Sequence, residues 1–130
     1  MAKLLVVDNS QGIRNMIKSA LEPLGHSVYQ AKNGKEGCRI AKNTVPDLVI
    51  MDYHLPDING FKAGCEIKKS SPSSNIQIVV MSREGDEKLM MEGLSSCADD
   101  YITKPFGARF LVSRITDMLE NAKRRKKHEK

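Results

Sequence analysis

Five polar residues of this sequence stand at the ends of short apolar runs, and their side chains could carry out chemistry together. Asp8 and Asn9 follow one run, Asp52 ends another, Ser82 closes a third and Lys104 follows a fourth. Oxygen ligands of this kind suit a hard divalent cation such as Mg²⁺. A carboxylate beside a cation, a hydroxyl and an ammonium can also attack phosphorus and hold an aspartyl phosphate. The pattern therefore indicates phosphoryl transfer, provided that the fold brings these residues together.

Charge suggests how such a site would work. Two carboxylates at neighbouring strand ends repel each other unless a cation lies between them. Lys104 could supply one positive charge there, and a magnesium ion could supply another. Both charges would neutralise oxygens of the transferred phosphoryl group, and Ser82 would donate a hydrogen bond to one of them. We therefore expect Asp8, Asp52, Ser82 and Lys104 to act as one site.

The apolar runs before these residues are too short for helices, so they predict buried strands. Strands are expected over residues 3–8, 26–31, 47–52, 76–81 and 101–103. The segments between them carry apolar residues at helical spacing or follow helix-starting residues, and Asn9 or Ser10 is placed to cap the first helix. Helices are expected around residues 13–24, 34–43, 61–69, 89–94 and 111–122, and the last of them could run on into the tail.

Strands and helices thus alternate five times along the chain. Continuously apolar strands that alternate with helices are typical of a parallel sheet covered on both faces. Right-handed crossovers leave few topologies, and the flavodoxin-like strand order 2-1-3-4-5 fits best. We therefore predict an α/β fold, a doubly wound (βα)5 domain over residues 1–122 with a basic tail over 123–130. Its site would lie at the carboxyl ends of strands 1 and 3, where the strand order reverses.

Composition excludes several classes of protein. The 130 residues are 40% apolar and 28% charged, which is typical of one globular domain. No apolar run approaches the roughly 18 residues of a membrane helix, and the N-terminus lacks a secretory cleavage site, so a cytoplasmic location is expected. Cys38, Cys65 and Cys97 show no metal-binding spacing, and we expect three reduced, mostly structural thiols.

The net charge of +5 comes from one end of the chain. The last eight residues, 123–130, hold six of the 21 basic residues and one of the 16 acidic residues, which leaves 15 of each sign in the body. Such a tail is usually a solvated helix end or the start of a linker, since Lys and Arg suit a helix C-terminus. It could also bind nucleic acid, but no reading helix or aromatic platform accompanies it.

Four stretches carry a resemblance to a known family. They read LLVVD at 4–8, PDLVIMD at 46–52, LPDINGF at 55–61 and ADDYITKPF at 98–106. In this order and spacing the chain resembles a response-regulator receiver domain, of the chemotaxis type found in two-component signalling, over residues 3–122. The resemblance implies a signalling switch that assists its own phosphorylation and dephosphorylation, rather than a conventional enzyme.

The resemblance also assigns roles to residues. It implies that Asp52 accepts a phosphoryl group from a histidine kinase or phosphotransfer protein, with Mg²⁺ as cofactor. Asp8 would help to hold the metal, and the backbone carbonyl of His54 would be a further ligand. Lys104 takes the place of the family's invariant lysine.

The resemblance also implies which residues pass the signal to a partner. Ser82 takes the place of the switch hydroxyl, and Tyr101 that of the switch aromatic residue. A downstream protein would bind helix 4, strand 5 and helix 5, roughly residues 89–118, and no membrane or nucleic-acid partner is expected. The chain would either signal by contact or be part of a longer regulator.

Two positions depart from the family pattern. Asn9 stands where a second acidic residue is usual, so it can ligate but brings no charge. Arg83 stands where a small residue is usual and, with Glu84, could gate the path of the phosphodonor. We therefore expect weak magnesium binding, slow phosphorylation by small donors and a comparatively long-lived phosphate.

Alternatives stay open at this stage. The departures would suit a pseudo-receiver, a protein-interaction module that works without phosphate. An aspartate-nucleophile phosphatase would need a second acid where His54 stands. Single residues also have plainer interpretations: Asp8 and Ser82 as helix caps, Tyr101 as a static exposed aromatic residue, the His54 imidazole without a role, and Asp57 as a turn residue outside the site.

Overall fold

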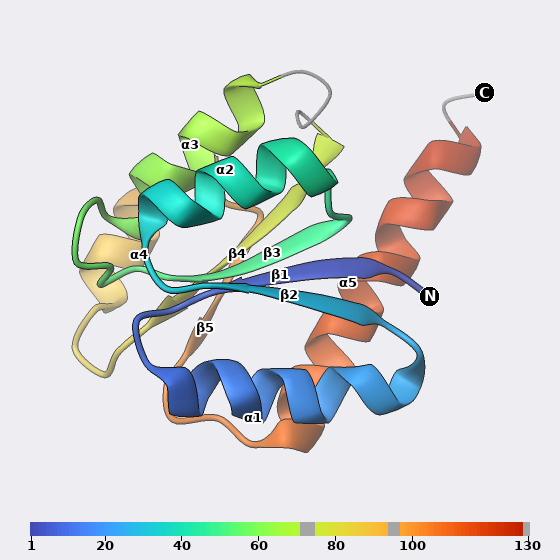
Figure 1. The fold of residues 1–130 in the computed structure, drawn as a ribbon, viewed down its shortest axis with the longest axis horizontal. Helices are drawn as coiled ribbons and strands as arrows, with labels where there is room; N and C mark the ends of the chain where they lie inside the picture. The colour runs from blue at the N-terminus through green and yellow to red at the C-terminus, as the bar shows by residue number, and fades with distance from the viewer. Residues whose placement is uncertain (71–74, 94–96, 129–130) are drawn as a thin grey trace.

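The computed structural model describes residues 1–70, 75–93 and 97–128, with side chains described as far as residue 124. Within those ranges, five parallel strands form one sheet in the order β2-β1-β3-β4-β5 (Figure 1). The strands are β1 (Lys3–Val7), β2 (Ser27–Ala31), β3 (Leu48–Asp52), β4 (Gln77–Ser82) and β5 (Asp100–Thr103). The predicted α/β class and strand order are confirmed.

Helices cover both faces of the sheet (Figure 1). They are α1 (Gln11–Leu21), α2 (Gly34–Thr44), α3 (Gly60–Lys69), α4 (Glu87–Gly93) and α5 (Ala108–His128), with a short 3-10 turn η1 (Glu22–Leu24) after α1. One core layer joins α1 and α5 to the sheet, and the other joins α2, α3 and α4 to its opposite face. Neighbouring residues such as Leu4 and Leu5 point into different layers, because side chains alternate along a strand.

The strands that carry the candidate residues lie in the middle of the sheet. Every residue of β3 and of β4 is buried, because helices cover these strands on both sides. The edge strand β2 alternates between exposed and half-buried residues from Ser27 to Gln30, and only its last residue, Ala31, is buried. The long apolar runs of the sequence therefore reflect burial on two faces.

Side-chain caps start three of the helices. Ser10 accepts a hydrogen bond from the backbone N–H of Ile13, and Asn33 and Asn59 cap α2 and α3 in the same way. Ser10 is therefore the cap of α1, one of the two residues expected in that role.

The last helix is longer than its apolar stripe predicts. It begins at Ala108 and runs to His128, so most of the basic tail continues α5. The apolar stripe marks only the part of the helix that packs on the sheet, and the polar turns beyond it carry no such signal. The tail side chains after residue 124, and residues 129–130 altogether, lie outside the described part.

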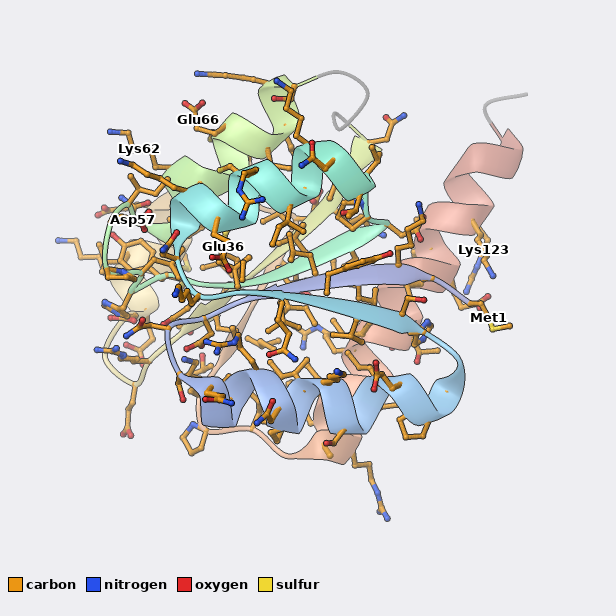
Figure 2. The ribbon with its side chains drawn as sticks, viewed as in Figure 1. Met1, Glu36, Asp57, Lys62, Glu66 and Lys123 are labelled. Atoms are coloured by element: carbon orange, nitrogen blue, oxygen red, sulfur yellow. A yellow bond between two sulfur atoms is a disulfide. The ribbon has the colours of Figure 1, made fainter. Side chains whose placement is uncertain are left out.

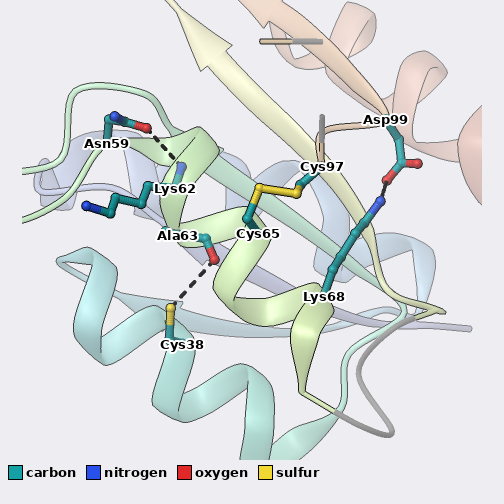
Figure 3. Close-up of a disulfide and its surroundings, with 8 residues drawn as sticks. All are labelled: Cys38, Asn59, Lys62, Ala63, Cys65, Lys68, Cys97 and Asp99. Atoms are coloured by element: carbon teal, nitrogen blue, oxygen red, sulfur yellow. Dashed lines mark hydrogen bonds and ion pairs between the residues drawn. A yellow bond between two sulfur atoms is a disulfide. The ribbon is translucent and has the colours of Figure 1, made fainter. Parts of the chain in front are cut away.

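The cysteine prediction was wrong for two of the three residues. Cys65 of α3 and Cys97, which precedes β5, form a disulfide with their Cα atoms 5.1 Å apart, and Cys38 is free (Figure 3). The two cysteines are 32 residues apart in the chain, and only the tertiary fold brings them together. In the ranges described, no helix is both long and apolar enough to cross a bilayer.

Candidate functional site

The sheet register brings the four predicted site residues to one edge. Parallel pairing places Asp52 beside Met81 on β4, and Ser82 beside Thr103 on β5. Asp8 directly follows Val7, which pairs with Met51 on β3. The predicted meeting of Asp8, Asp52, Ser82 and Lys104 at the carboxyl edge therefore follows from the strand order.

A lysine joins the two carboxylates. Asp8 and Asp52 are 2% and 3% exposed, so neither charge is well hydrated. The Nζ of Lys104 lies 2.7 Å from Oδ2 of Asp8 and 3.5 Å from Oδ1 of Asp52. Two buried carboxylates would repel each other strongly without a neighbouring cation. Lys104 supplies the positive charge that the sequence predicted for this place.

Asp8 is fixed on its other side by the chain that follows. Its Oδ1 accepts a hydrogen bond of 2.8 Å from the backbone N–H of Ser10. Its backbone carbonyl accepts a bond of 2.7 Å from Nη1 of Arg14. The side chain therefore organises the start of α1 and also faces Lys104, so a helix-starting role and a site role coexist.

One oxygen of Asp52 is open. Oδ1 contacts Lys104 and accepts a long bond of 3.3 Å from the backbone N–H of His54. Among the described residues, Oδ2 has no hydrogen-bond or ion-pair partner. Every fully buried side-chain oxygen in that part of the chain does have a partner, so Oδ2 must reach solvent. The carboxylate is therefore held at one oxygen and free at the other.

The loop after Asp52 turns very close to this site. Gly60 donates a backbone bond of 3.0 Å to the carbonyl of Tyr53. A Cβ at Gly60 would lie 2.6 Å from the backbone carbonyl oxygen of Asp52. Only glycine therefore lets α3 begin at this distance from the central strand.

Ser82 points towards β5. Its hydroxyl donates to the backbone carbonyl of Ile102 at 3.3 Å and lies 2.8 Å from the hydroxyl of Thr103. It is 1% exposed. These contacts do not involve the start of α4, so Ser82 is not the cap of that helix.

The His54 imidazole has a structural partner. Its Nε2 lies 2.8 Å from Oδ2 of Asp86, which also accepts a bond of 2.8 Å from the backbone N–H of Arg83. That backbone bond, followed by the bond to His54, holds the pKa of Asp86 below its ordinary value. The pair ties the loop after β3 to the loop after β4 across the mouth of the site.

The remaining predicted residues surround this centre. Asn9, Arg83 and Glu84 are exposed, and no contact fixes their side chains on Asp52. Tyr101 is half-buried against the core layer of α2, α3 and α4, so it is not a freely exposed aromatic residue.

The donor set fits a hard cation. Asp8 and Asp52 present carboxylate oxygens at one edge, the backbone carbonyl of His54 follows two residues later, and Asn9 is exposed beside Asp8. Oxygen-only donors of this kind suit Mg²⁺. Over the described residues, no cluster of three or more His, Cys, Asp and Glu side chains is placed to hold a metal ion by itself.

Sequence reasoning missed two residues near the site. Asp86 contacts His54, and Thr103 contacts Ser82. Asp57, interpreted from the sequence as a turn residue outside the site, accepts bonds of 2.8 Å from the backbone N–H groups of Gly34 and Lys35 (Figure 2 shows Asp57 where α2 begins). Asp86 directly precedes helix α4, and an Asp at that position predicts a helix cap. No local pattern in the sequence predicts its contact with His54.

Comparison with known proteins gives one consistent result. The family model described as "Response regulator receiver domain" matches residues 4–116. The chain is 34% identical to Protein PilH of Pseudomonas aeruginosa over 119 residues, which cover 92% of this chain and 98% of that protein. It is 35% identical to the phosphate regulon transcriptional regulatory protein PhoB of the same species over 116 residues, which cover 89% and 51%.

Solved structures agree with this assignment. The chemotaxis response regulator CheY4 of Vibrio cholerae superposes with a TM-score of 0.84 at 28% identity, covering 90% of this chain and 98% of that one. NtrX of Brucella abortus gives a TM-score of 0.90 at 28% identity, covering 98% and 29%. The chain spans about half the length of most of the curated relatives it matches, PilH being an exception.

Proposed function

Because this chain belongs to the response regulator receiver domain family, we propose that it is a phosphorylation switch whose acceptor is Asp52. The observation that carries the proposal is the asymmetry of the Asp52 carboxylate. Oδ1 is engaged by Lys104 and by the His54 N–H, while Oδ2 has no hydrogen-bond or ion-pair partner among the described residues and is not fully enclosed. A carboxylate held in this way presents a single oxygen to an incoming phosphorus atom.

The transfer step follows from that geometry. Oδ2 of Asp52 forms the new P–O bond as the P–N bond to a phosphohistidine of the donor breaks, and a proton returns to the donor imidazole. Lys104 stabilises the developing charge on the phosphoryl oxygens. Asp8, Asp52 and the His54 carbonyl would hold Mg²⁺, which would supply further positive charge to those oxygens.

The signal then starts from Ser82. In the unphosphorylated arrangement its hydroxyl faces Ile102 and Thr103 on β5. A phosphoryl group on Asp52 offers a charged acceptor, so the hydroxyl turns from β5 towards it. Tyr101, two residues before Thr103, then changes its packing, and the populations of α4, β5 and α5 shift.

The partners follow from the same function. A histidine kinase or phosphotransfer protein would donate the phosphoryl group in the cytoplasm, and a downstream protein or output domain would bind the surface of α4, β5 and α5. One structural neighbour is the receiver domain of a histidine kinase from Syntrophus aciditrophicus, with 28% identity and a TM-score of 0.85.

Labelling with a small phosphodonor tests the function. The chain is incubated with acetyl phosphate and either Mg²⁺ or EDTA, and its intact mass is measured over time. The proposal predicts a gain of one phosphoryl group with Mg²⁺ and a much slower gain with EDTA. No gain under either condition, in protein that is folded by circular dichroism, would favour the pseudo-receiver function.

A further inference from the structure

Three contacts join helix α3 to the chain that leads from α4 into β5. The ring of Phe61 lies so close to Gly93 that a Cβ there would overlap it. Cys65 forms the disulfide with Cys97, and Nζ of Lys68 lies 2.8 Å from Oδ2 of Asp99 (Figure 3). These contacts connect the end of α4 and the approach to β5 with a single helix.

The three α3 residues occupy one helix face. Positions 61, 65 and 68 are spaced as i, i+4 and i+7, and their partners at 93, 97 and 99 follow in the same chain order. The opposite side of α3 is fixed to the core, because Ala63 and Ile67 are buried. Helix α3 is therefore a fixed base, and the α4–β5 connection is the part attached to it.

We propose that Cys65 and Cys97 are a reversible redox modification site that clamps the α4–β5 connection to α3, with a low-molecular-weight disulfide such as oxidised glutathione as co-reactant. The proposal goes beyond the proposed function and rests on it only in naming α4 and β5 as part of the output surface. Both cysteines are half-buried rather than enclosed, so a small thiol or disulfide can reach the pair.

The chemistry balances with that co-reactant. One protein thiolate attacks the small disulfide, forms a mixed disulfide and releases one small thiolate. The second protein thiolate attacks the protein sulfur of the mixed disulfide and releases the other small thiolate. The protein loses two electrons and two protons, and one small disulfide becomes two small thiols. Reduction runs the same steps backwards.

Cys38 is a bystander in this chemistry. Its Sγ donates to the backbone carbonyl of Ala63 at 3.7 Å, and it contacts α3 from the side of α2 (Figure 3). Burial, followed by the charges of Glu66 and Asp57, raises the pKa of its thiol. A protonated thiol is a poor nucleophile in disulfide exchange, so Cys38 serves as an internal control.

The clamp matters because α4 has few other attachments. This helix has seven residues, and Met90 is the buried one among them, while Leu89 and Met91 are 40% and 74% exposed. Gly93 is four residues before Cys97, so the chain allows them to separate by at most about 14 Å. With Cys97 bonded to α3, the end of α4 must therefore stay near that helix.

Reduction is expected to loosen this region alone. The ion pair between Lys68 and Asp99 remains when the disulfide opens, and Asp99 also accepts a bond of 2.8 Å from the backbone N–H of Ile78. The start of β5 therefore stays in place. Helix α4 keeps Met90 and the contact with Phe61 but loses its covalent limit, so it opens more often.

Two measurements on the same protein test the proposal. The chain, with Cys38→Ser as a matched control variant, is equilibrated in oxidised or reduced glutathione buffer. Peptide mapping without reductant should find Cys65 linked to Cys97 in both proteins in the oxidised buffer, and free thiols in the reduced buffer. Amide hydrogen exchange should then be about tenfold or more faster in α4 of the reduced protein, with α1 unchanged.

Other outcomes would overturn it. A cystine that involves Cys38, or equal α4 exchange in the two buffers, contradicts the clamp. Cys65→Ser should show the fast α4 exchange in both buffers; if it does not fold, the two redox states of the wild type still decide the question. No phosphoryl group takes part, so these readouts succeed or fail independently of labelling at Asp52.

Discussion

The hydroxyl oxygens of Ser82 and Thr103 lie 2.8 Å apart at the carboxyl ends of the paired strands β4 and β5. Ser82 also lies 3.3 Å from the carbonyl of Ile102, and either hydroxyl can donate in the pair with Thr103. In the proposed switch, Ser82 would give up both bonds to reach a phosphoryl group on Asp52. We therefore expect Thr103 to stabilise the unphosphorylated state.

Removing the Thr103 hydroxyl should favour the switched state. A neutral hydrogen bond contributes about 1 kcal/mol net, which corresponds to about a fivefold change in population. We expect Thr103→Val to reach half-conversion at about one fifth of the wild-type concentration of beryllofluoride, a phosphoryl mimic, in the presence of Mg²⁺. Amide chemical shifts of β5 report the conversion. Thr103→Ser keeps the hydroxyl and should match the wild type; equal shifts for both variants would point to packing instead.

Adding the missing charge at position 9 should tighten magnesium binding. One unit charge about 4 Å away is worth roughly 4 kcal/mol at an effective dielectric of about 20. Asn9 is exposed, so water offsets most of this, and about 1–2 kcal/mol should remain for Asn9→Asp. We expect roughly tenfold tighter Mg²⁺ binding in an isothermal titration. Tight binding by the wild type, with no gain in the variant, would contradict the charge argument.

Shortening Arg83 should open the donor path. Its backbone N–H is fixed by Asp86, and its side chain is exposed beside the site. Arg83→Ala should label with acetyl phosphate about threefold faster, a barrier lower by about 0.7 kcal/mol. Glu84→Ala is the matched control at the neighbouring exposed position. It separates the effect of side-chain bulk at position 83 from the effect of a general change in loop charge. If neither variant labels faster, the gate does not exist.

The contact between Asp57 and the start of α2 should contribute less to stability in acid. Desolvation would raise the pKa of Asp57, but hydrogen bonds from the N–H groups of Lys35, Gly34 and Ile58 outweigh it and hold that pKa below 3.8. Because the unfolded chain binds the proton more readily, this contribution is present above about pH 4 and is lost as pH falls through the folded pKa.

Urea unfolding checks this sign. Asp57→Ala should lower the free energy of unfolding by about 1 kcal/mol at pH 7, as loss of a helix cap does. The difference between wild type and variant should shrink as pH falls through the lowered pKa of Asp57. A difference that stays constant with pH would show that the carboxylate charge is not what stabilises the loop.

The sequence predicted each strand to within one residue at either end. This precision has a physical basis, because β1, β3 and β4 are buried on two faces, so their interior residues are apolar up to the buried polar residues Asp8, Asp52 and Ser82 at the carboxyl edge. The convergence of Asp8, Asp52, Ser82 and Lys104 followed from strand order alone. The end of α5 was not predictable in the same way, since its last turns extend past the sheet and lack an apolar stripe.

Side-chain pairings lay beyond sequence reasoning. The link from His54 to Asp86 joins two loops, and the link from Cys65 to Cys97 joins residues 32 positions apart. Neither has a periodic or local signal, and the expected cytoplasmic location argued against a disulfide. The direction of the Ser82 side chain depends on its rotamer and on its neighbour Thr103. The apolar pattern of a strand carries no information on either.

The most direct test of the central claim compares Asp52→Asn with Asp57→Asn. Both variants replace one carboxylate by an amide within the same six residues, but only the first removes the open Oδ2 that faces the donor. With acetyl phosphate and Mg²⁺, intact mass should show one added phosphoryl group on the wild type and on Asp57→Asn, and none on Asp52→Asn. Labelling of Asp52→Asn at the wild-type rate, or its absence from all three proteins, would contradict the assignment of Asp52 as the acceptor.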